Sequence, residues 1–315
     1  MKVCFVVMTH HQPEIFRLLV KNITSPSADI VVHLDRRADL SAFVNPDIPR
    51  LHFMRRRNRV HWAGWSQAKT ICEALEYALT ISDADYFIFL AGTDFPIQGS
   101  DRLVAHLQSI WPANLLNYYP LVPGIWGYML IGRYHLVDLR TSLTRIAIPY
   151  GSRSFGTLVR KLEARLNARF QPRNTTWTNI YSGSSRWCLN RETVRYVVDF
   201  YRSSASRRLK KFLRLSANTD EIFFQTAILN SSHRHACIGF DETEALEIFD
   251  GKRPPLPDEK RVYMHYIDWS RERENPAILD EADFEHLKQS GKFFAVKFTD
   301  AKSLGLARRI EKELL

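Results

Sequence analysis

One carboxylate in this chain stands where it could take a proton from a substrate hydroxyl. Glu221 belongs to the segment NTDE (218–221), which directly precedes the apolar run IFF and predicts the start of a helix. The same spacing matches a capping box, with Asn218 as the cap and Glu221 at the third helical position, and the helix dipole also favours acids in a first turn. These residues alone leave both roles open for Glu221, a general base or a structural cap.

Aromatic and cationic side chains could supply what transfer of a sugar from a nucleotide donor needs besides a base. Such a transfer needs apolar walls for the sugars and positive charge on the leaving diphosphate. Trp62 stands in an aromatic loop, HWAGWS (61–66), and could stack on a ring, although tryptophan is also common in cores. Lys297 stands in the apolar stretch FFAVKF (293–298), where a cation needs an anionic partner or an exposed face. A diphosphate partner and a surface position are both compatible with Lys297.

The acids near the predicted strands favour a site without a metal. Many sugar transferases hold a metal with an Asp-x-Asp at the carboxyl end of a strand. The one Asp-x-Asp here, Asp83-Ala84-Asp85, precedes the apolar run 86–90 and so lies at the wrong end of that strand. Asp94 stands alone after the run, where open α/β sheets bind their ligands. We therefore expect no metal and no cofactor, with Lys and Arg neutralising the phosphates.

The composition favours a large α/β domain that binds an anion. The chain has 315 residues, of which 45% are hydrophobic and 25% charged, and its net charge is +10. Positive charge attracts phosphates, nucleotides, acidic glycans, nucleic acids and membrane surfaces without choosing among them. The sequence contains no GxGxxG, P-loop, HExxH or GxSxG motif. Dinucleotide redox chemistry, NTP hydrolysis, zinc proteolysis and α/β-hydrolase chemistry therefore lose their usual support.

Cysteine spacing and hydropathy indicate a cytoplasmic protein. Cys4, Cys72, Cys188 and Cys237 are scattered singly, which is typical of reduced, buried thiols. No apolar run reaches the roughly 20 residues of a membrane span, and we expect MKVCFVVM (1–8) to be a first strand rather than a signal peptide. The predicted protein is soluble and cytoplasmic, and its basic surface allows peripheral contact with the inner membrane face.

The order of predicted elements indicates a Rossmann-type sheet. Apolar runs at 3–8, 29–35, 51–54 and 86–90 predict strands, with helices at 14–23, up to about 81, and at 101–110. This alternation is typical of a mainly parallel sheet flanked by helices. We predict a main domain at 1–250, with a donor half at about 1–112 and an acceptor half at about 113–250. A linker beginning GKRPP opens a C-terminal segment, 251–315.

Short motifs spread over nearly the whole chain occur in an order typical of one enzyme family. They are VVHLD (31–35), HWAGWS (61–66), YFIFLAGTDFPI (86–97), SGSSRWCLNRE (182–192), TDEIFF (219–224) and FFAVKF (293–298). Together they resemble the core-2/I-branching N-acetylglucosaminyltransferases and peptide O-xylosyltransferases of glycosyltransferase family 14. Their number and order make the resemblance more specific than any one motif would be.

The resemblance implies an inverting, metal-independent GT-A fold that uses a UDP-sugar and forms a β-linkage. By position in the motifs, Asp35 would contact the uridine and Trp62 would lie beside the donor. Glu221 would deprotonate the acceptor hydroxyl, and Lys297 would bind the donor diphosphate. We also place Asp94 on the donor side. The C-terminal segment would thereby complete the diphosphate site.

Two parts of the predicted site depart from the family pattern. Where the family carries a second cation for the diphosphate, this chain has His265, and Arg271 or Arg273 could take over that role. A histidine there could be protonated beside a diphosphate.

On the acceptor side, the aromatic pair of the mammalian members has no counterpart near 240–249. We expect Arg133, Tyr134 and Trp187 on that side instead.

The predicted function is transfer of a sugar, foremost N-acetylglucosamine, from a UDP-sugar to a hydroxyl of a glycan or polysaccharide. A xylosyl or glucuronosyl donor is the alternative within the family. A rival from another class is a non-catalytic binder of polyanions or nucleic acid, suggested by the basic segments 55–59 and 202–214. Charge is its only support, because we find no RNA- or DNA-binding signature, so we expect no nucleic-acid partner.

Overall fold

The computed structural model describes residues 1–44, 48–139, 152–170, 173, 177, 179–254, 264–270 and 276–315, with backbone alone over 152–157. Its strands are β1 (Val3–Thr9), β2 (Ala28–Leu34), β3 (Leu51–Phe53), β4 (Tyr86–Ala91), β5 (Asp94–Pro96), β6 (Tyr119–Pro120), β7 (Tyr181–Ser182), β8 (Cys188–Asn190), β9 (His265–Ile267) and β10 (Phe294–Val296). Its α-helices are α1 (Pro13–Ile23), α2 (Trp65–Ile81), α3 (Ser100–Ser109), α4 (Met129–Gly132), α6 (Ser152–Arg169), α7 (Arg191–Arg202), α8 (Arg207–Leu213), α9 (Phe223–Leu229), α10 (Glu242–Phe249), α11 (Phe284–Gln289) and α12 (Leu304–Glu313). Short 3₁₀ turns are η1 (Trp126–Tyr128), η2 (Thr219–Glu221), η3 (Ser232–Ala236) and η4 (Glu281–Asp283).

The central sheet has five strands in the order β3-β2-β1-β4-β8. The first four are parallel, and β8 runs antiparallel to β4 at the edge. Val3 pairs with Ala28 on one side and with Tyr86 on the other. The apolar runs without alternation are therefore strands covered on both faces, as parallel strands are. The predicted α/β class, a mostly parallel sheet flanked by helices and consistent with a GT-A-like fold, is confirmed.

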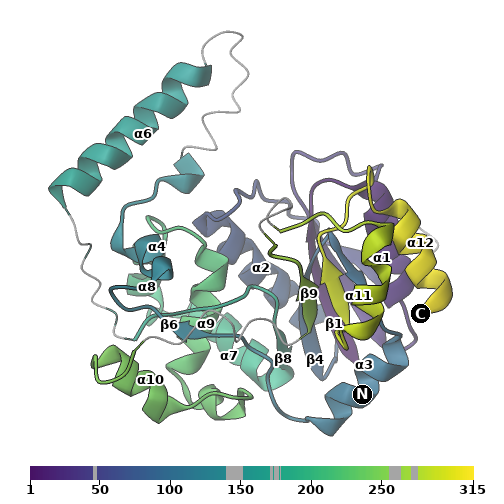
Figure 1. The fold of residues 1–315 in the computed structure, drawn as a ribbon. Helices are drawn as coiled ribbons and strands as arrows, with labels where there is room; N and C mark the ends of the chain where they lie inside the picture. The colour runs from purple at the N-terminus through teal and green to yellow at the C-terminus, as the bar shows by residue number, and fades with distance from the viewer. Residues whose placement is uncertain are drawn as a thin grey trace.

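Helices cover both faces of this sheet and close two hydrophobic cores (Figure 1). Side chains alternate along β1 because successive Cβ atoms point to opposite faces. Cys4 and Val6 belong to the core with α2, α7 and α9. Val3, Phe5 and Val7 belong to the core with α1, α11 and α12. Each face of the sheet therefore depends on helices from distant parts of the chain.

The C-terminal segment joins the same body through a second, three-stranded sheet in the order β5-β10-β9. In it β10 is antiparallel to β5, with Val296 opposite Asp94, and parallel to β9, with Phe294 opposite His265. Helix α12 packs against α1 and places Ile310 in the core shared with β1. The segment 264–315 thus brings its own residues to the edge where the chain leaves β4.

Some local predictions change in the structure. Asn218 is not a helix cap: it has a left-handed conformation with φ 48°, and its side chain makes no capping hydrogen bond. The capping-box interpretation is therefore wrong. The four cysteines are buried and unpaired, as predicted.

Helix α6 projects from the body of the molecule in Figure 1 and is attached along one side through Tyr134 and Leu136. Within the described residues, no helix combines the length and apolar character needed to cross a bilayer.

Candidate active site

The site forms where the strand order of the central sheet reverses, between the carboxyl ends of β1 and β4. Sheets of this type bind ligands at that point because the connections leave in opposite directions and open a crevice. The two strand ends lie close together: the Gly92 amide donates to the Met8 carbonyl at 2.8 Å. A Cβ on Gly92 would lie 2.2 Å from the Thr9 hydroxyl. Only glycine fits there without displacing the end of β1.

Asp35, directly after β2, is 3% exposed, and its carboxylate accepts four hydrogen bonds. Its Oδ1 accepts from the Arg37 amide at 2.9 Å and Nε at 2.8 Å, and its Oδ2 accepts from Arg37 Nη2 at 2.7 Å and the Val60 amide at 2.8 Å. Burial raises the pKa of this carboxyl, but these hydrogen bonds outweigh burial and lower the pKa to about 2. Asp35 is therefore an anion that ties the end of β2 to the loop carrying Trp62.

Trp62 lies in that loop with 81% of its surface exposed. The next residue, Ala63, has φ 64°, and its amide donates to Gln67 Oε1 at 3.0 Å. The same Gln67 side chain donates from Nε2 to Asp220 Oδ2 at 2.7 Å. One glutamine thus fixes the aromatic loop and the turn before Glu221 together, while the indole stays open to solvent.

Glu221 ends the 3₁₀ turn η2 and is half-buried. Thr219 Oγ1 donates to the Gly64 carbonyl at 2.8 Å, and Asn218 Nδ2 donates to Glu221 Oε2 at 3.1 Å. The Gly183 amide donates to the Glu221 carbonyl at 2.9 Å. The carboxylate is therefore held on a turn anchored from two sides, although no capping box forms it.

Arg186 connects this turn to the end of β4. Its Nη2 donates to Asp94 Oδ1 at 3.0 Å and its Nε to Asp94 Oδ2 at 3.2 Å, and its charge also attracts Glu221 and Asp220. Asp94 is fully buried and also accepts from the Ala91 amide at 2.9 Å. Burial raises the pKa of Asp94, but Arg186 and the nearby His265 ring outweigh burial and hold the pKa below its usual value.

The turn contains a second carboxyl group with a different environment. Asp220 is 4% exposed. Burial raises its pKa to about 6, against the opposing attraction of Arg186. Burial therefore favours the protonated form of Asp220, one residue before Glu221.

His265 and Lys297 reach the site from the second sheet. His265 is 3% exposed, its Nε2 lies 3.4 Å from Asp94 Oδ2, and its ring stacks on Phe294. Burial lowers the pKa of His265, although Asp94 partly opposes this. Lys297 is half-buried and follows Val296, the residue opposite Asp94.

The chain after β10 runs beside the loops that follow β4 and β1. The Phe298 amide donates to the Thr93 carbonyl at 2.9 Å, and the Asp300 amide donates to the Gln12 side chain. The charge of Lys297 reaches His11 and helps to lower its pKa to about 4, after burial and the neighbouring His10. Lys297 therefore lies at the edge where the β1 and β4 turns meet.

The predicted acceptor residues divide between the surface and the core. Arg133 is exposed and Tyr134 is half-buried, on a segment whose His135 amide donates to the Leu215 carbonyl shortly before η2. Trp187 is 1% exposed and packs between Phe89 and Phe224. Trp187 therefore belongs to the core and has no face open to an acceptor, contrary to the prediction.

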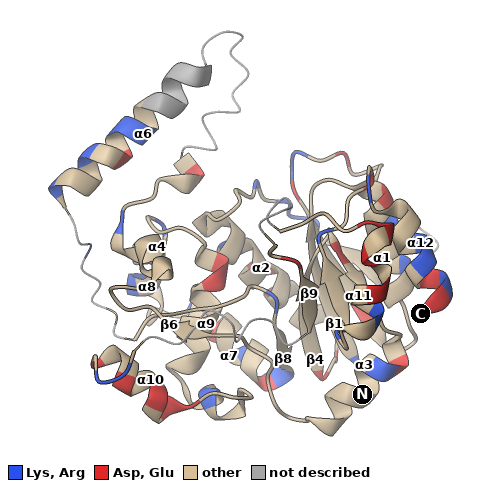
Figure 2. Cartoon of the chain, viewed as in Figure 1, with Lys and Arg blue, Asp and Glu red and all other residues tan. Residues whose placement is uncertain are grey.

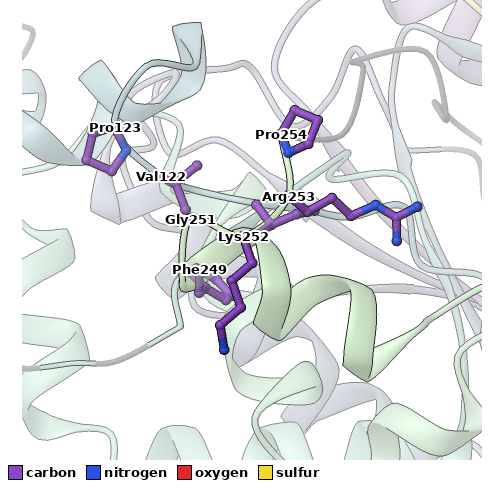
Figure 3. Close-up of a pocket in the computed structure, with 8 residues that line it drawn as sticks. Val122, Pro123, Phe249, Gly251, Lys252, Arg253 and Pro254 are labelled. Carbon is purple, nitrogen blue, oxygen red and sulfur yellow. The ribbon is translucent and has the colours of Figure 1, made fainter.

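A cavity of about 430 Å³ lies at the end of α10 (Figure 3). Its lining residues are Val122, Pro123, Ile248, Phe249, Gly251, Lys252, Arg253 and Pro254. Phe249 stacks edge-on against Tyr181 of β7, the strand that leads to Gly183 and so to the Glu221 turn. None of the residues predicted from sequence lines this cavity.

Other predictions concern metals and cations. Among the described residues, no three His, Cys, Asp or Glu side chains are grouped as metal ligands would be. Arg271 and Arg273 lie outside the part of the chain that the structure describes.

Sequence reasoning missed Arg186 and Asp220. Arg186 is next to Trp187 in the motif SGSSRWCLNRE, but both residues precede β8, so no strand alternation indicates which of them faces the site. Asp220 stood beside Glu221 in the same turn. No pattern in the sequence indicates its link to Gln67, because that contact depends on how α2 packs against η2.

Comparison with known proteins agrees with the motifs. Xylosyltransferase 1 of Rattus norvegicus is 24% identical over 312 residues, which cover 94% of this chain and 33% of that protein. Xylosyltransferase 1 of Homo sapiens is 26% identical over 242 residues, which cover 75% of this chain and 22% of that protein. The xylosyltransferase of Ciona intestinalis is 24% identical over 322 residues, which cover 99% of this chain and 34% of that protein. The chain thus spans between about a fifth and a third of the length of the curated relatives it matches.

Among solved structures, the chain described as "Crystal Structure of A197 from STIV" aligns over 62% of this chain and 68% of its own length. The TM-score is 0.26 and the identity 14%, values that bear on neither fold nor function. The model of the family described as "Branch: Core-2/I-Branching enzyme" matches residues 3–289. This match covers most of the sequence, and the chain therefore belongs to the core-2/I-branching enzyme family, glycosyltransferase family 14.

Proposed function

We propose that this protein is an inverting β-glycosyltransferase that transfers a sugar from a UDP-sugar to a hydroxyl of a glycan, without a metal. The observation that carries the proposal is one continuous set of contacts. Asp35 is hydrogen-bonded to the loop that carries Trp62, and that loop is hydrogen-bonded to the turn that carries Glu221. The charge of Arg186 attracts Glu221. Arg186 is in turn hydrogen-bonded to Asp94, which pairs with β10 next to Lys297.

In the proposed reaction Glu221 takes the proton from the acceptor hydroxyl as its oxygen bonds to the anomeric carbon. The bond between that carbon and the UDP oxygen breaks on the opposite face, so the configuration inverts. The leaving diphosphate carries the electron pair, and Lys297 and Arg186 stabilise its charge. Asp94, being buried, positions Arg186 instead of touching the donor.

Asp35 is proposed to bind the uridine, and its present contacts say how. Its two oxygens already accept the four hydrogen bonds that a carboxylate can take. A uridine imide N–H would have to replace one donor, and we propose that it displaces the Arg37 side chain, which is 27% exposed and would also give up its hydrogen bond to the Val60 carbonyl. The released guanidinium would then be available to a phosphate.

The donor sugar has three candidates. N-acetylglucosamine follows from the motif resemblance, and xylose is the second candidate because the relatives described above are named xylosyltransferases. Glucuronate remains the third sugar within the family. On the acceptor side we propose Arg133 and Tyr134, which lie on a segment bonded to the residues just before η2. A non-catalytic polyanion binder would need neither the anchored Glu221 nor an exposed Trp62.

The test combines binding with turnover. Thermal shift is measured with UDP-N-acetylglucosamine, UDP-xylose, UDP-glucuronate and UDP, since only ligands that favour the native state raise the melting temperature. Glu221→Gln should keep the UDP shift and lose transfer, whereas Glu192→Gln, an exposed acid of α7, should keep both. No shift with any uridine ligand, or turnover by Glu221→Gln, would refute the proposal. Transfer in excess EDTA is expected, and strict dependence on added Mn²⁺ would overturn the metal-free site.

A further inference from the structure

Helix α6 presents one face that the rest of the described molecule does not cover. Its inner side is tied down: Val159 is 3% exposed, and Glu163 Oε1 accepts from the Leu136 amide at 2.6 Å. Asn167 accepts from the Tyr134 amide at 2.8 Å and donates to the Tyr134 carbonyl at 3.0 Å. The helix is thereby held in a fixed orientation, with its other side pointing away from the body (Figure 1).

The outer side combines leucines with cations. Leu158 is 57% and Leu162 44% exposed. The spacing 158, 162, 165, 169 follows one face of a helix and continues the two leucines with Arg165 and Arg169. Lys161 lies next to this stripe, and Figure 2 shows Lys and Arg recurring along α6. Among residues 158–170 the one acid is Glu163, which is turned inward.

We propose that α6 binds the surface of an anionic lipid membrane. Exposed leucines on a helix held parallel to a surface can enter the headgroup region, while arginines on the same face bind lipid phosphates. Cations alone would suit RNA or an acidic glycan equally well, but exposed leucines add nothing to such a partner and do favour lipid. The inference does not depend on the donor or on the reaction proposed above.

The experiment is co-sedimentation of the full chain with vesicles of mixed phosphatidylglycerol and phosphatidylcholine, compared with phosphatidylcholine alone. The protein should sediment with the anionic vesicles and much less with the neutral ones. The pair Arg165→Gln/Arg169→Gln should lower the partition coefficient about fivefold for each cation removed. The matched pair Arg207→Gln/Arg208→Gln removes the same charge from exposed positions of α8 and should change it far less.

Leu158→Ser/Leu162→Ser separates lipid insertion from charge alone. It should also release the protein from anionic vesicles while leaving the melting temperature of the protein unchanged. Undiminished binding by this variant would assign the face to a polyanion and overturn the proposal. Equal loss in the α8 pair would do the same, because the net charge of +10 would then account for binding. Dimerisation in solution abolished by the leucine pair, without vesicle binding, would assign the face to a second copy.

Discussion

Arg186 is the residue on which the charges of the site converge. Its guanidinium is bonded to the fully buried Asp94 and attracted by Glu221 and Asp220. A planar guanidinium can hold one carboxylate through two nitrogens and still face another anion, which lysine cannot do. In the proposed function the same group meets the diphosphate, so structure and catalysis depend on one side chain.

Arg186→Met should cost about 3–5 kcal/mol of the free energy of unfolding, because Asp94 is left buried without its counter-charge. Denaturation in urea measures this. The double variant Arg186→Met/Asp94→Asn removes both charges and should recover most of the stability but not sugar transfer. If the double variant is no more stable than the single one, the ion pair is not the source of the loss.

Asp35 predicts a pH dependence of stability. The pKa of Asp35 is about 2 in the folded protein and 3.8 in the unfolded chain. Asp35 therefore makes its full contribution to the free energy of unfolding above pH 3.8, and this contribution is lost as the pH falls towards 2. Asp35→Asn should therefore lower the free energy of unfolding by about 2 kcal/mol at pH 7. The difference from the unmodified protein should shrink below pH 4. Asp101→Asn, an exposed acid of α3, is the control and should show no such convergence.

At this scale, the motifs indicate which residues to expect in the site but not which of two neighbours faces it. Trp187 was expected at the acceptor and is in the core, while Arg186 beside it is bonded to Asp94. A residue type states what a side chain could do. Its face depends on the path of the chain between β7 and β8, where neither Arg186 nor Trp187 belongs to a strand, and the sequence pattern does not indicate that path.

At the scale of elements, the segment after β7 supports the turn that carries Glu221. The Gly183 amide donates to the Glu221 carbonyl, and the Ser184 carbonyl accepts from Gln225 Nε2 at 2.7 Å. A Cβ on Gly183 would lie 2.0 Å from the Asn117 carbonyl oxygen, a backbone atom that cannot turn aside. The absence of a side chain here sets the distance between the β6–β7 pair and η2.

Gly183→Ala should therefore destabilise the protein by about 1–3 kcal/mol and reduce transfer further than its loss of stability explains. The two effects are separated by measuring turnover well below the melting temperature. Gly99→Ala is the matched control, since the nearest atom to its added Cβ is 3.8 Å away. Gly99 is the N-cap of α3, so this change should cost about 1 kcal/mol or less through the lost capping preference and should leave transfer unchanged.

The strands of the sheet could be predicted because their apolar runs leave few alternatives, and four of them pair in parallel as expected. The η2 turn could not be predicted from the sequence in this way. The sequence NTDE permits a capping box, but Asn218 takes a left-handed conformation instead. The preceding residue, Ala217, is held by a hydrogen bond to the Leu130 carbonyl. Such a contact between distant segments outweighs a local capping preference.

For the whole molecule, the C-terminal segment is part of the core. Large side chains from 264–315 fill the core on the β1, α1 face, among them Leu279, Phe284, Phe294, Phe298 and Ile310. Strand β10 also supplies the pairing partner of β5 and so fixes the position of Asp94. The boundary predicted at 250 marks a linker in the sequence, and the packing continues across it.

A chain ending at Arg253 should not fold cooperatively. Each large core side chain that it lacks is worth about 2–5 kcal/mol, and several together exceed the roughly 5–15 kcal/mol by which a domain is stable. The measurement is near-UV circular dichroism with urea denaturation. A chain lacking Leu315 alone, which is 39% exposed, is the control. A sharp unfolding transition in the short chain would show that 1–253 is an independent domain.

The placement of the cysteines has an experimental consequence. Cys4, Cys72 and Cys237 lie on one side of the central sheet and Cys188 on the other. Burial raises the pKa of Cys237 to about 12, so an alkylating reagent meets almost no thiolate until the polypeptide opens. Mass spectrometry after timed alkylation would therefore show which half of the interior loosens first, with the native sulfhydryls as the only labels.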